Sequence, residues 1–393
     1  MTNTITWQVL FVDDEPEICQ QVREFLEGES ITGEGEYPRA ETSTDFAKAL
    51  ELLEARRFDL VILDVRLGAH DQPAPQEEIG VKTLEAIQQR RFVPVVFYTA
   101  LPRLVQDLKT PLIQVVEKTE GLPHLLETVR GIFATRLPAV NRALIRHMET
   151  VQRNYMWDFV ATHWEQFGGT PDRTALAYLL ARRLAVSLSG PGIRQLAQDL
   201  GDSMGTAVVE GWVHPMQYYV MPPVETLPLA GDLYRGQIGS QIGYWVLLTP
   251  SCDFVERDNK PQKAEWVLLA YCNLLTEQSE CLKWQAGLPQ PSKTTDDNLR
   301  GLIGNNRQGG QPERFYFLPG ALTLPDLVAD LQQLATVPRK HLHSLERLAS
   351  LDSPFAEALL ARFARYFGRL GTPDLNVEVT LSRLRSMSER GTE

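Results

Sequence analysis

The sequence Val9-Leu10-Phe11-Val12-Asp13-Asp14-Glu15-Pro16 decides how the first third of the chain folds. Four consecutive apolar residues are typical of a buried strand, and the acidic residues and the proline that follow end it. The same pattern returns in Leu60-Val61-Ile62-Leu63-Asp64, in residues 93–99 and in residues 113–118. These later strands end at Asp64, at Thr99 and just before Lys118, so each strand is followed by a polar side chain.

Segments with helical spacing of apolar residues lie between these strands. They cover residues 17–26, 46–53, 81–87 and 122–133, and a weaker strand is expected near residues 38–42. Continuous apolar strands that alternate with helices imply a parallel sheet covered on both faces. We therefore predict that residues 1–135 form an α/β domain with a doubly wound parallel sheet.

The polar residues at the strand ends suggest a chemistry. In doubly wound sheets, functional groups gather beyond the carboxyl ends of the strands. Asp13, Asp14 and Asp64 would repel one another there, so a divalent cation is expected to hold them, and ligands that are all oxygen favour Mg²⁺. Thr99 and Lys118 supply a hydroxyl and a positive charge for a phosphoryl group, and one carboxylate can act as the nucleophile.

Residues 1–135 resemble the receiver domain of two-component response regulators, which has a flavodoxin-like fold. The resemblance implies that Asp64 is the phosphoacceptor and that a histidine kinase or a phosphotransfer protein supplies the phosphoryl group. It also implies a Mg²⁺ site made by Asp13, Asp14, Asp64 and the backbone carbonyl of Arg66. The motifs that carry the resemblance are Val9 to Pro16, Leu60 to Asp64, Val95-Val96-Phe97-Tyr98-Thr99-Ala100 and Glu117-Lys118.

By the same resemblance, Thr99 is the switch hydroxyl, Ala100 leaves room for the phosphate, and Lys118 pairs with the phosphoryl group. A receiver that folds but is not phosphorylated is the alternative. The sequence departs from the usual pattern in the long polar loop at residues 68–79, which either selects a kinase or is a passive surface loop. It also has Val115 where many members carry an aromatic switch residue, and Thr119 where proline is usual.

Residues 136–212 are predicted to be a helical segment, either a transmitting or dimerising element or part of the next domain. Apolar residues recur at helical spacing from Leu137 to Phe159. Residues 193–209 resemble a helix-turn-helix. Residues 202–212, however, contain no Arg, Lys, Asn or Gln to read a DNA groove, so a packed helix pair is favoured over DNA binding.

Residues 213–393 are predicted to be a β-rich, barrel-like output domain with C-terminal helices. Expected strands start at Gly231-Asp232 and cover residues 243–249, 264–272 and 314–319. An inserted loop of about 30 residues includes the basic stretch Lys283 to Arg307, which would touch RNA or an acidic partner, or simply be solvated. Leu342, Leu345 and Leu348, followed by residues 355–367, are expected to form a helical tail.

Residues 231–253 weakly resemble uncharacterised modules of bacterial conflict and phage-defence loci, and their opening is similar to the small barrels of MazF-like RNA-cleaving toxins. The resemblance names no chemistry. Cys252 and Asp253 are the one candidate output site. A cysteine nucleophile needs a base and an electropositive setting, so a buried thiol beside a turn-capping carboxylate is the alternative.

Composition limits the remaining possibilities. Residues 1–135 contain 23 Asp and Glu against 13 Lys and Arg, whereas the other residues contain 27 against 26, so no general nucleic-acid footprint is present. The four cysteines form no CxxC pair, and no apolar run approaches the roughly 18 residues of a membrane span, so we expect a cytoplasmic protein with reduced thiols.

The sequence therefore predicts a response regulator whose output module acts through protein contacts. An unknown output partner and a homodimer are both left open. The alternative is an effector enzyme or toxin gated by the receiver and acting on nucleic acid, with a role in phage defence. No clear catalytic constellation follows residue 135, so whether the output half is an enzyme stays undecided.

Overall fold

A computed structural model describes residues 5–32, 36–65, 79–167, 173–188, 213–256, 264–307, 311–369 and 375–390. The chain divides into two compact units, Met1–Thr206 and Ala207–Glu393, and each is described here by itself. Among the described helices, none is both long enough and apolar enough to cross a lipid bilayer.

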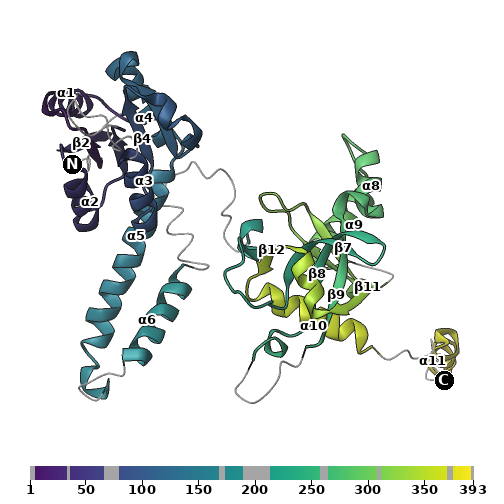
Figure 1. Cartoon of the computed structure of the whole chain (residues 1–393). Helices are drawn as coiled ribbons and strands as arrows, with labels where there is room; N and C mark the ends of the chain where they lie inside the picture. Colours follow the sequence, from purple (N-terminus) through teal and green to yellow (C-terminus); the bar gives the residue numbers. More distant parts are fainter. Residues whose placement is uncertain are drawn as a thin grey trace. The chain divides into compact units, whose positions relative to one another are not determined.

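The first unit opens with a five-stranded sheet in the order β2-β1-β3-β4-β5, in which all neighbouring strands are parallel (Figure 1). Helices connect successive strands, except between the last two. This arrangement confirms the predicted doubly wound α/β fold. The elements are β1 (Ile5–Val12), α1 (Pro16–Glu27), β2 (Glu36–Ser43), α2 (Phe46–Ala55), β3 (Leu60–Leu63), α3 (Ile79–Arg90), β4 (Val95–Thr99), β5 (Ile113–Glu117) and α4 (Gly121–Ala134).

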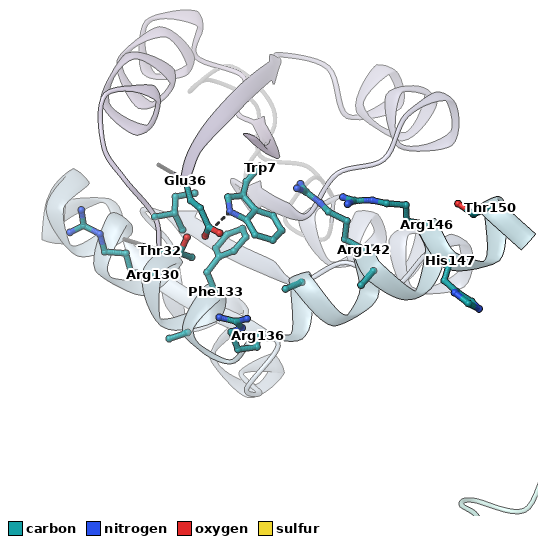
Figure 2. A pocket seen from close by; sticks show the side chains of 14 residues that line it. Trp7, Thr32, Glu36, Arg130, Phe133, Arg136, Arg142, Arg146, His147 and Thr150 are labelled. Atoms are coloured by element: carbon teal, nitrogen blue, oxygen red, sulfur yellow. Dashed lines mark hydrogen bonds between the residues drawn. The ribbon is translucent and has the colours of Figure 1, made fainter. Parts of the chain in front are cut away.

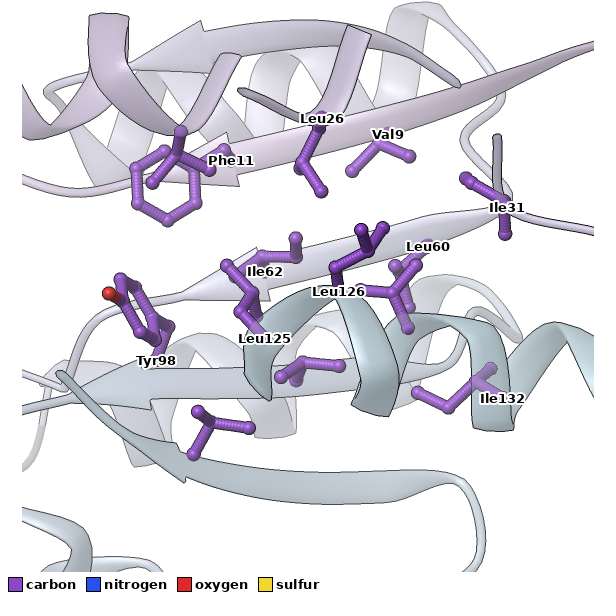
Figure 3. Close-up of a cluster of buried hydrophobic side chains, with 14 of the residues drawn as sticks. Val9, Phe11, Leu26, Ile31, Leu60, Ile62, Tyr98, Leu125, Leu126 and Ile132 are labelled. Carbon is purple, nitrogen blue, oxygen red and sulfur yellow. The ribbon is translucent and has the colours of Figure 1, made fainter. Parts of the chain in front are cut away.

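Alternating side chains of the central strands fill two separate cores, which explains why the strands are apolar throughout. On β1, Val9 and Phe11 join the core against α1 and α4, whereas Leu10 and Val12 join the core against α2 and α3. Figure 3 shows the first of these cores, with Leu26 of α1 and Leu125 of α4 packed against the strands. Because both faces are covered, these strand residues are fully buried.

The connection from β4 to β5 contains two short 3₁₀ turns, Pro102–Leu104 and Gln106–Leu108, where the other crossovers have an α-helix. Val105 between the turns is buried in the core beside α2 and α3. Val115 of β5, noted in the sequence for its unusual identity, packs against the same core and is only partly buried. The short connection therefore covers the edge strand less fully than a helix covers the central strands.

Two helices complete the described part of the first unit. α5 (Leu137–Asn154) starts after Arg136, which adopts a left-handed backbone conformation (φ 64°), and continues as a π-helical stretch, Tyr155–Val160. α6 (Arg173–Ser187) runs beside α5 (Figure 1). The predicted helix from Leu137 to Phe159 is confirmed. The possible helix-turn-helix at residues 193–209 lies outside the described residues.

The second unit is built on an antiparallel seven-stranded sheet in the order β10-β11-β9-β8-β7-β12-β6. Its two edges approach each other, because the Tyr219 hydroxyl on β6 donates a hydrogen bond of 2.8 Å to the Pro319 carbonyl just after β10. The predicted β-rich domain is confirmed as an antiparallel sheet, and closure of this sheet into a barrel stays a prediction. The strands are β6 (Tyr219–Val220), β7 (Asp232–Ile238), β8 (Gln241–Leu247), β9 (Trp266–Leu274), β10 (Phe315–Leu318), β11 (Leu327–Pro338) and β12 (Glu346–Leu351).

The helices of this unit correct two predictions. Leu342, Leu345 and Leu348 do not form a helix, because residues 346–350 pair with β7 as strand β12 and Leu342 lies in a 3₁₀ turn. The stretch Lys283 to Arg307 is not a plain loop. It contains most of α8 (Ser279–Ala286) and all of α9 (Lys293–Ile303), which Ser292 caps and whose Leu299 and Leu302 are buried.

The helical tail is otherwise present, as α10 (Phe355–Phe367) and α11 (Val377–Arg390). α10 covers one face of the sheet through buried Leu359 and Tyr366. The sequence missed β11 altogether, although it is the longest strand of this sheet.

Strands β7 and β12 are joined by a buried ionic network around Asp232. The Asp232 carboxylate is fully buried and accepts hydrogen bonds from the Ser350 hydroxyl at 2.6 Å and the Leu229 amide at 2.7 Å. Arg347 contacts both carboxylate oxygens, with Nη2 at 3.0 Å and Nε at 2.8 Å. A buried charge is tolerated when such donors replace its hydration.

Replacing Asp232 by alanine should therefore destabilise the second unit by about 3–5 kcal/mol, because Arg347 keeps its charge without a partner. The measurement is urea denaturation of the parent and of Asp232→Ala. Glu346→Ala is the matched control, because the Arg235–Glu346 ion pair joins the same two strands but both side chains are more than half exposed. Glu346→Ala should change the free energy of unfolding little. Equal losses in the two variants would contradict the claim that the buried network stabilises the unit more than the exposed ion pair does.

Candidate functional site

Three carboxylates meet at the carboxyl edge of the parallel sheet. Asp13 follows β1 and is fully buried, Asp64 follows β3 and is 5% exposed, and Asp14 is partly buried. Ligand atoms of all three lie within 4.8 Å of one another. Neighbouring parallel strands end at the same edge, so residues 50 positions apart in the sequence come together here.

Lys118 places a positive charge between two of these carboxylates. It is the first residue of a short 3₁₀ turn, Lys118–Glu120, directly after β5. Its ammonium nitrogen lies 2.8 Å from Asp13 Oδ2 and 2.9 Å from Asp64 Oδ2. The side chain is 17% exposed, so both ion pairs are shielded from water.

The charges in this site shift one another's pKa. Burial raises the pKa of Asp13, and the charge of Asp64 acts in the same direction, against the hydrogen bond from Lys118. Burial also opposes the charged form of Lys118, but its hydrogen bonds to Asp13 and Asp64 outweigh this and raise the pKa of the lysine. Lys118 therefore stays protonated and compensates part of the buried negative charge.

Backbone amides hold the acidic and hydroxyl side chains in fixed orientations. The Val65 amide donates to Asp64 Oδ1 at 2.6 Å, and the Glu15 amide donates to Asp13 Oδ1 at 3.0 Å. Thr99, at the end of β4, is fully buried, and its hydroxyl oxygen accepts a hydrogen bond from the Leu101 amide at 3.1 Å. The hydroxyl hydrogen of Thr99 is left to donate elsewhere.

The site has the charge and the donor atoms that a magnesium ion requires. Three carboxylates against one ammonium leave an excess of two negative charges when all are ionised. Every available ligand atom is an oxygen, which suits a hard cation such as Mg²⁺. The residues present therefore fit a divalent cation.

The structure thus gathers Asp13, Asp14, Asp64 and Lys118 in one site, with Thr99 at the same edge of the sheet. Arg66, whose carbonyl was predicted to be a further ligand, and most of the long loop at residues 68–79 lie outside the described residues. Tyr98 is a buried sheet residue, with its ring centre 6.5 Å from that of Phe11.

Two residues of the site were not singled out from the sequence. Glu15 brings a carboxylate oxygen to 4.0 Å from the Lys118 ammonium and supplies the amide that holds Asp13. The buried Cys19 thiol donates to the Asp13 carbonyl oxygen at 3.3 Å. Glu15 directly follows the two aspartates, so its position was the available signal, whereas Cys19 reads in the sequence as an ordinary residue on the buried face of α1.

The fold and the site together define a class of protein. The strand order of the parallel sheet makes this a doubly wound domain, with an acidic cluster and a lysine at its carboxyl edge. Residues 9–130 match the family described as the response regulator receiver domain. This part of the chain is therefore a response regulator receiver domain, which links the protein to phosphorelay-type signalling.

Several solved receiver structures are similar to this domain. The Francisella response regulator 1452 receiver domain is 18% identical, with 33% of this chain and 98% of that chain covered and a TM-score of 0.26. The response regulator TrrA from Thermotoga maritima, in complex with Mg²⁺-BeF, is 24% identical, with 32% of this chain and 98% of that chain covered and a TM-score of 0.26. CheY4 of Vibrio cholerae is 23% identical, with 32% of this chain and 98% of that chain covered and a TM-score of 0.25. No curated protein matches the chain. The domain assignment rests on the family match and not on these likenesses.

The candidate output site lies in the second unit, in a 3₁₀ turn after β8, Ser251–Asp253. Cys252 is exposed, and its sulfur lies 3.7 Å from Asp253 Oδ1. Among the described residues, no histidine ring is hydrogen-bonded to this thiol. The interpretation of Cys252 as a buried thiol is wrong, and the base that a cysteine nucleophile needs is not found beside it in the described part of the chain.

Exposure predicts that Cys252 is the first thiol to react with an alkylating reagent. Cys19, Cys272 and Cys281 are buried, and burial raises the pKa of all three thiols, that of Cys19 to about 11, so little thiolate forms near neutral pH. Brief iodoacetamide treatment of the native protein should give one adduct by intact mass. Cys252→Ser should give none, and urea should expose the remaining thiols. Rapid native labelling of Cys252→Ser would show that one of the other thiols is open.

Proposed function

We propose that Asp64 accepts a phosphoryl group from a histidine kinase or a phosphotransfer protein, and that this modification changes what the rest of the chain contacts. The observation that carries the proposal is the meeting of Asp13, Asp14 and Asp64 with Lys118 in a domain of the receiver family. In this proposal residues 1–135 receive the signal, residues 136–212 transmit it, and residues 213–393 provide the output.

Asp64 is oriented for attack on phosphorus. One carboxylate oxygen is held by the Val65 amide and the other by Lys118. In the transfer, a carboxylate oxygen forms the new O–P bond while the N–P bond to the donor imidazole breaks, and that bond's electron pair returns to the ring nitrogen. Lys118 then pairs with the phosphoryl oxygens, and the Thr99 hydroxyl donates a hydrogen bond to them.

Mg²⁺, held by Asp13, Asp14, Asp64 and the Arg66 carbonyl, would neutralise charge on the transferring oxygens. The three carboxylates lie close enough together to hold one cation. Lys118 also holds Asp13 and Asp64 together, since each would otherwise face the other's charge without compensation.

The signal has a short path from the site to the helical segment. Lys118 starts the 3₁₀ turn that leads directly into α4 and then α5. A phosphoryl group adds roughly two negative charges and would draw Lys118 away from Asp13, which shifts the start of this path. The proposed output is contact with another protein. In support of it, the helical segment exposes large apolar side chains, including Trp157 at 72% and Tyr178 at 74%.

Labelling with acetyl phosphate or phosphoramidate and Mg²⁺ tests the proposal. The parent chain should gain one phosphoryl group by intact mass, and Asp64→Asn should gain none because no nucleophile remains. Asp107→Asn, which alters an exposed carboxylate of the same domain, is the matched control and should be labelled like the parent. Light scattering before and after labelling reads the output, since a change in size assigns the contact to a second copy. Unchanged labelling of Asp64→Asn would disprove the assigned acceptor.

Magnesium should also stabilise the receiver domain without any phosphoryl donor. A ligand that binds only the folded state adds about 2.7 kcal/mol when its free concentration is about 100 times its dissociation constant. Thermal melting with and without Mg²⁺ should show this gain in the parent and in the control Glu17→Gln, an exposed carboxylate on α1. Asp13→Asn and Asp14→Asn should each lose most of the gain. If both variants respond to Mg²⁺ as the parent does, the cation binds elsewhere.

A further inference from the structure

A cavity lies at the opposite end of the parallel strands from the acidic cluster. Its volume is about 920 Å³, within the range of small-molecule sites. One wall comes from the sheet domain, with Trp7 near the start of β1, Thr32 before β2 and Glu36 at the start of β2. The other wall comes from the end of α4 and most of α5, from Ala139 to Thr150 (Figure 2). The proposed phosphorylation chemistry uses none of these residues.

The charge of the described lining is positive. Glu36 is the one acidic residue among the described lining residues, and its carboxylate accepts a hydrogen bond from the Trp7 indole at 3.3 Å. Four guanidinium groups and one imidazole also line the cavity, and Figure 2 shows them from the end of α4 along α5. The four guanidinium groups still exceed the carboxylates by one when Glu36 is counted together with Asp59 and Glu29, which pair with two of the arginines. The basic residues are Arg130, Arg136, Arg142, Arg146 and His147.

Arg142 and Arg130 have structural partners, and Arg136 also interacts within the protein, so Arg146 is the chief candidate for binding an external group. Arg142 forms an ion pair with Asp59, with Nε 2.9 Å from Oδ1, and stacks on Trp7 at 3.9 Å. Arg130 lies 3.2 Å from a carboxylate oxygen of Glu29. Arg146 is exposed, and within the described ranges it forms no ion pair.

The remaining lining is mostly apolar and contains one unsatisfied polar group. Trp7 and Phe133 pack with their ring centres 4.9 Å apart, and Ala139 and Ala143 present small side chains from α5. The Thr32 hydroxyl oxygen is buried beneath this wall and has no hydrogen-bond partner among the described residues.

We propose that this cavity binds a small organic phosphate, with the phosphate at Arg146 and an apolar body against Ala139 and Ala143. Guanidinium groups bind phosphate through paired, charge-assisted hydrogen bonds, and small alanine side chains leave room for a ring or chain. The ligand would touch both the sheet domain and α5. Because the His147 ring also lies 3.1 Å from the Ser187 carbonyl of α6, the ligand would hold the α5–α6 pair against the sheet.

Isothermal titration of the full chain with 1-naphthyl phosphate tests the proposal. Arg146→Gln removes the charge, and Ala143→Leu fills the space without changing the charge. Each should weaken binding by about tenfold or more, since the loss of one charge-assisted pair is of that order. Arg103→Gln, an exposed arginine of the same domain outside the cavity, is the matched control and should bind like the parent.

Two further probes separate the contributions of charge and shape. The neutral analogue 1-naphthalenemethanol should bind at least tenfold more weakly than the phosphate, and 1-naphthoate shows whether a carboxylate can replace the phosphate. Thermal melting of each variant checks that it is folded, and Arg146→Gln is expected to fold normally because the side chain is exposed. The proposal is overturned if the parent does not bind the phosphate, or if parent, Arg146→Gln and Ala143→Leu bind it equally.

Discussion

The ammonium group of Lys118 between Asp13 and Asp64 is the interaction on which the receiver domain depends. Both carboxylates are almost completely buried, because the strands that carry them are covered on both faces by helices. Two such charges cannot share a dry site unless an opposite charge or a cation compensates them. Lys118 reaches them from the end of β5, so the site exists only when β1, β3 and β5 are in register. Correct pairing of the strands is therefore required both for the fold of this domain and for the geometry of its site.

This coupling explains why the first domain could be predicted from sequence. A strand buried on both faces must be apolar at every position, so the segments ending in Asp13, Asp64 and Thr99 are recognisable without any partner. The rule that function gathers at the carboxyl ends then brings these polar residues together. Their mutual distances could not be predicted, because these depend on how the strand ends turn. The position of Glu15 after the two aspartates was a usable signal, but its contacts with Asp13 and Lys118 depend on the same turn.

The second unit was harder to predict, because its strands are defined by pairing over long distances. Leu342, Leu345 and Leu348 have a spacing that also suits a helix, and only pairing with β7 makes residues 346–350 a strand. The buried hydrogen bond from the Ser350 hydroxyl to Asp232 joins residues 118 positions apart, and no local sequence pattern predicts it. The reverse error occurred at α9, where Ser292 and the spacing of Leu299 and Leu302 were a readable helix signal that the abundance of polar residues obscured.

The two ends of β1 and β3 carry the two sites discussed above. Asp13 and Asp64 follow these strands, while Asp59 precedes β3, pairs with Arg142 of α5, and exchanges backbone and side-chain hydrogen bonds with Gln8 of β1. β3 is only four residues long, so Asp64 and Asp59, the anchor of α5, lie at opposite ends of one short element. A second connection runs from Lys118 through α4 to the start of α5. Both routes end on α5, so a change in charge at Asp64 and a ligand beside Arg142 would act on the position of the same helix.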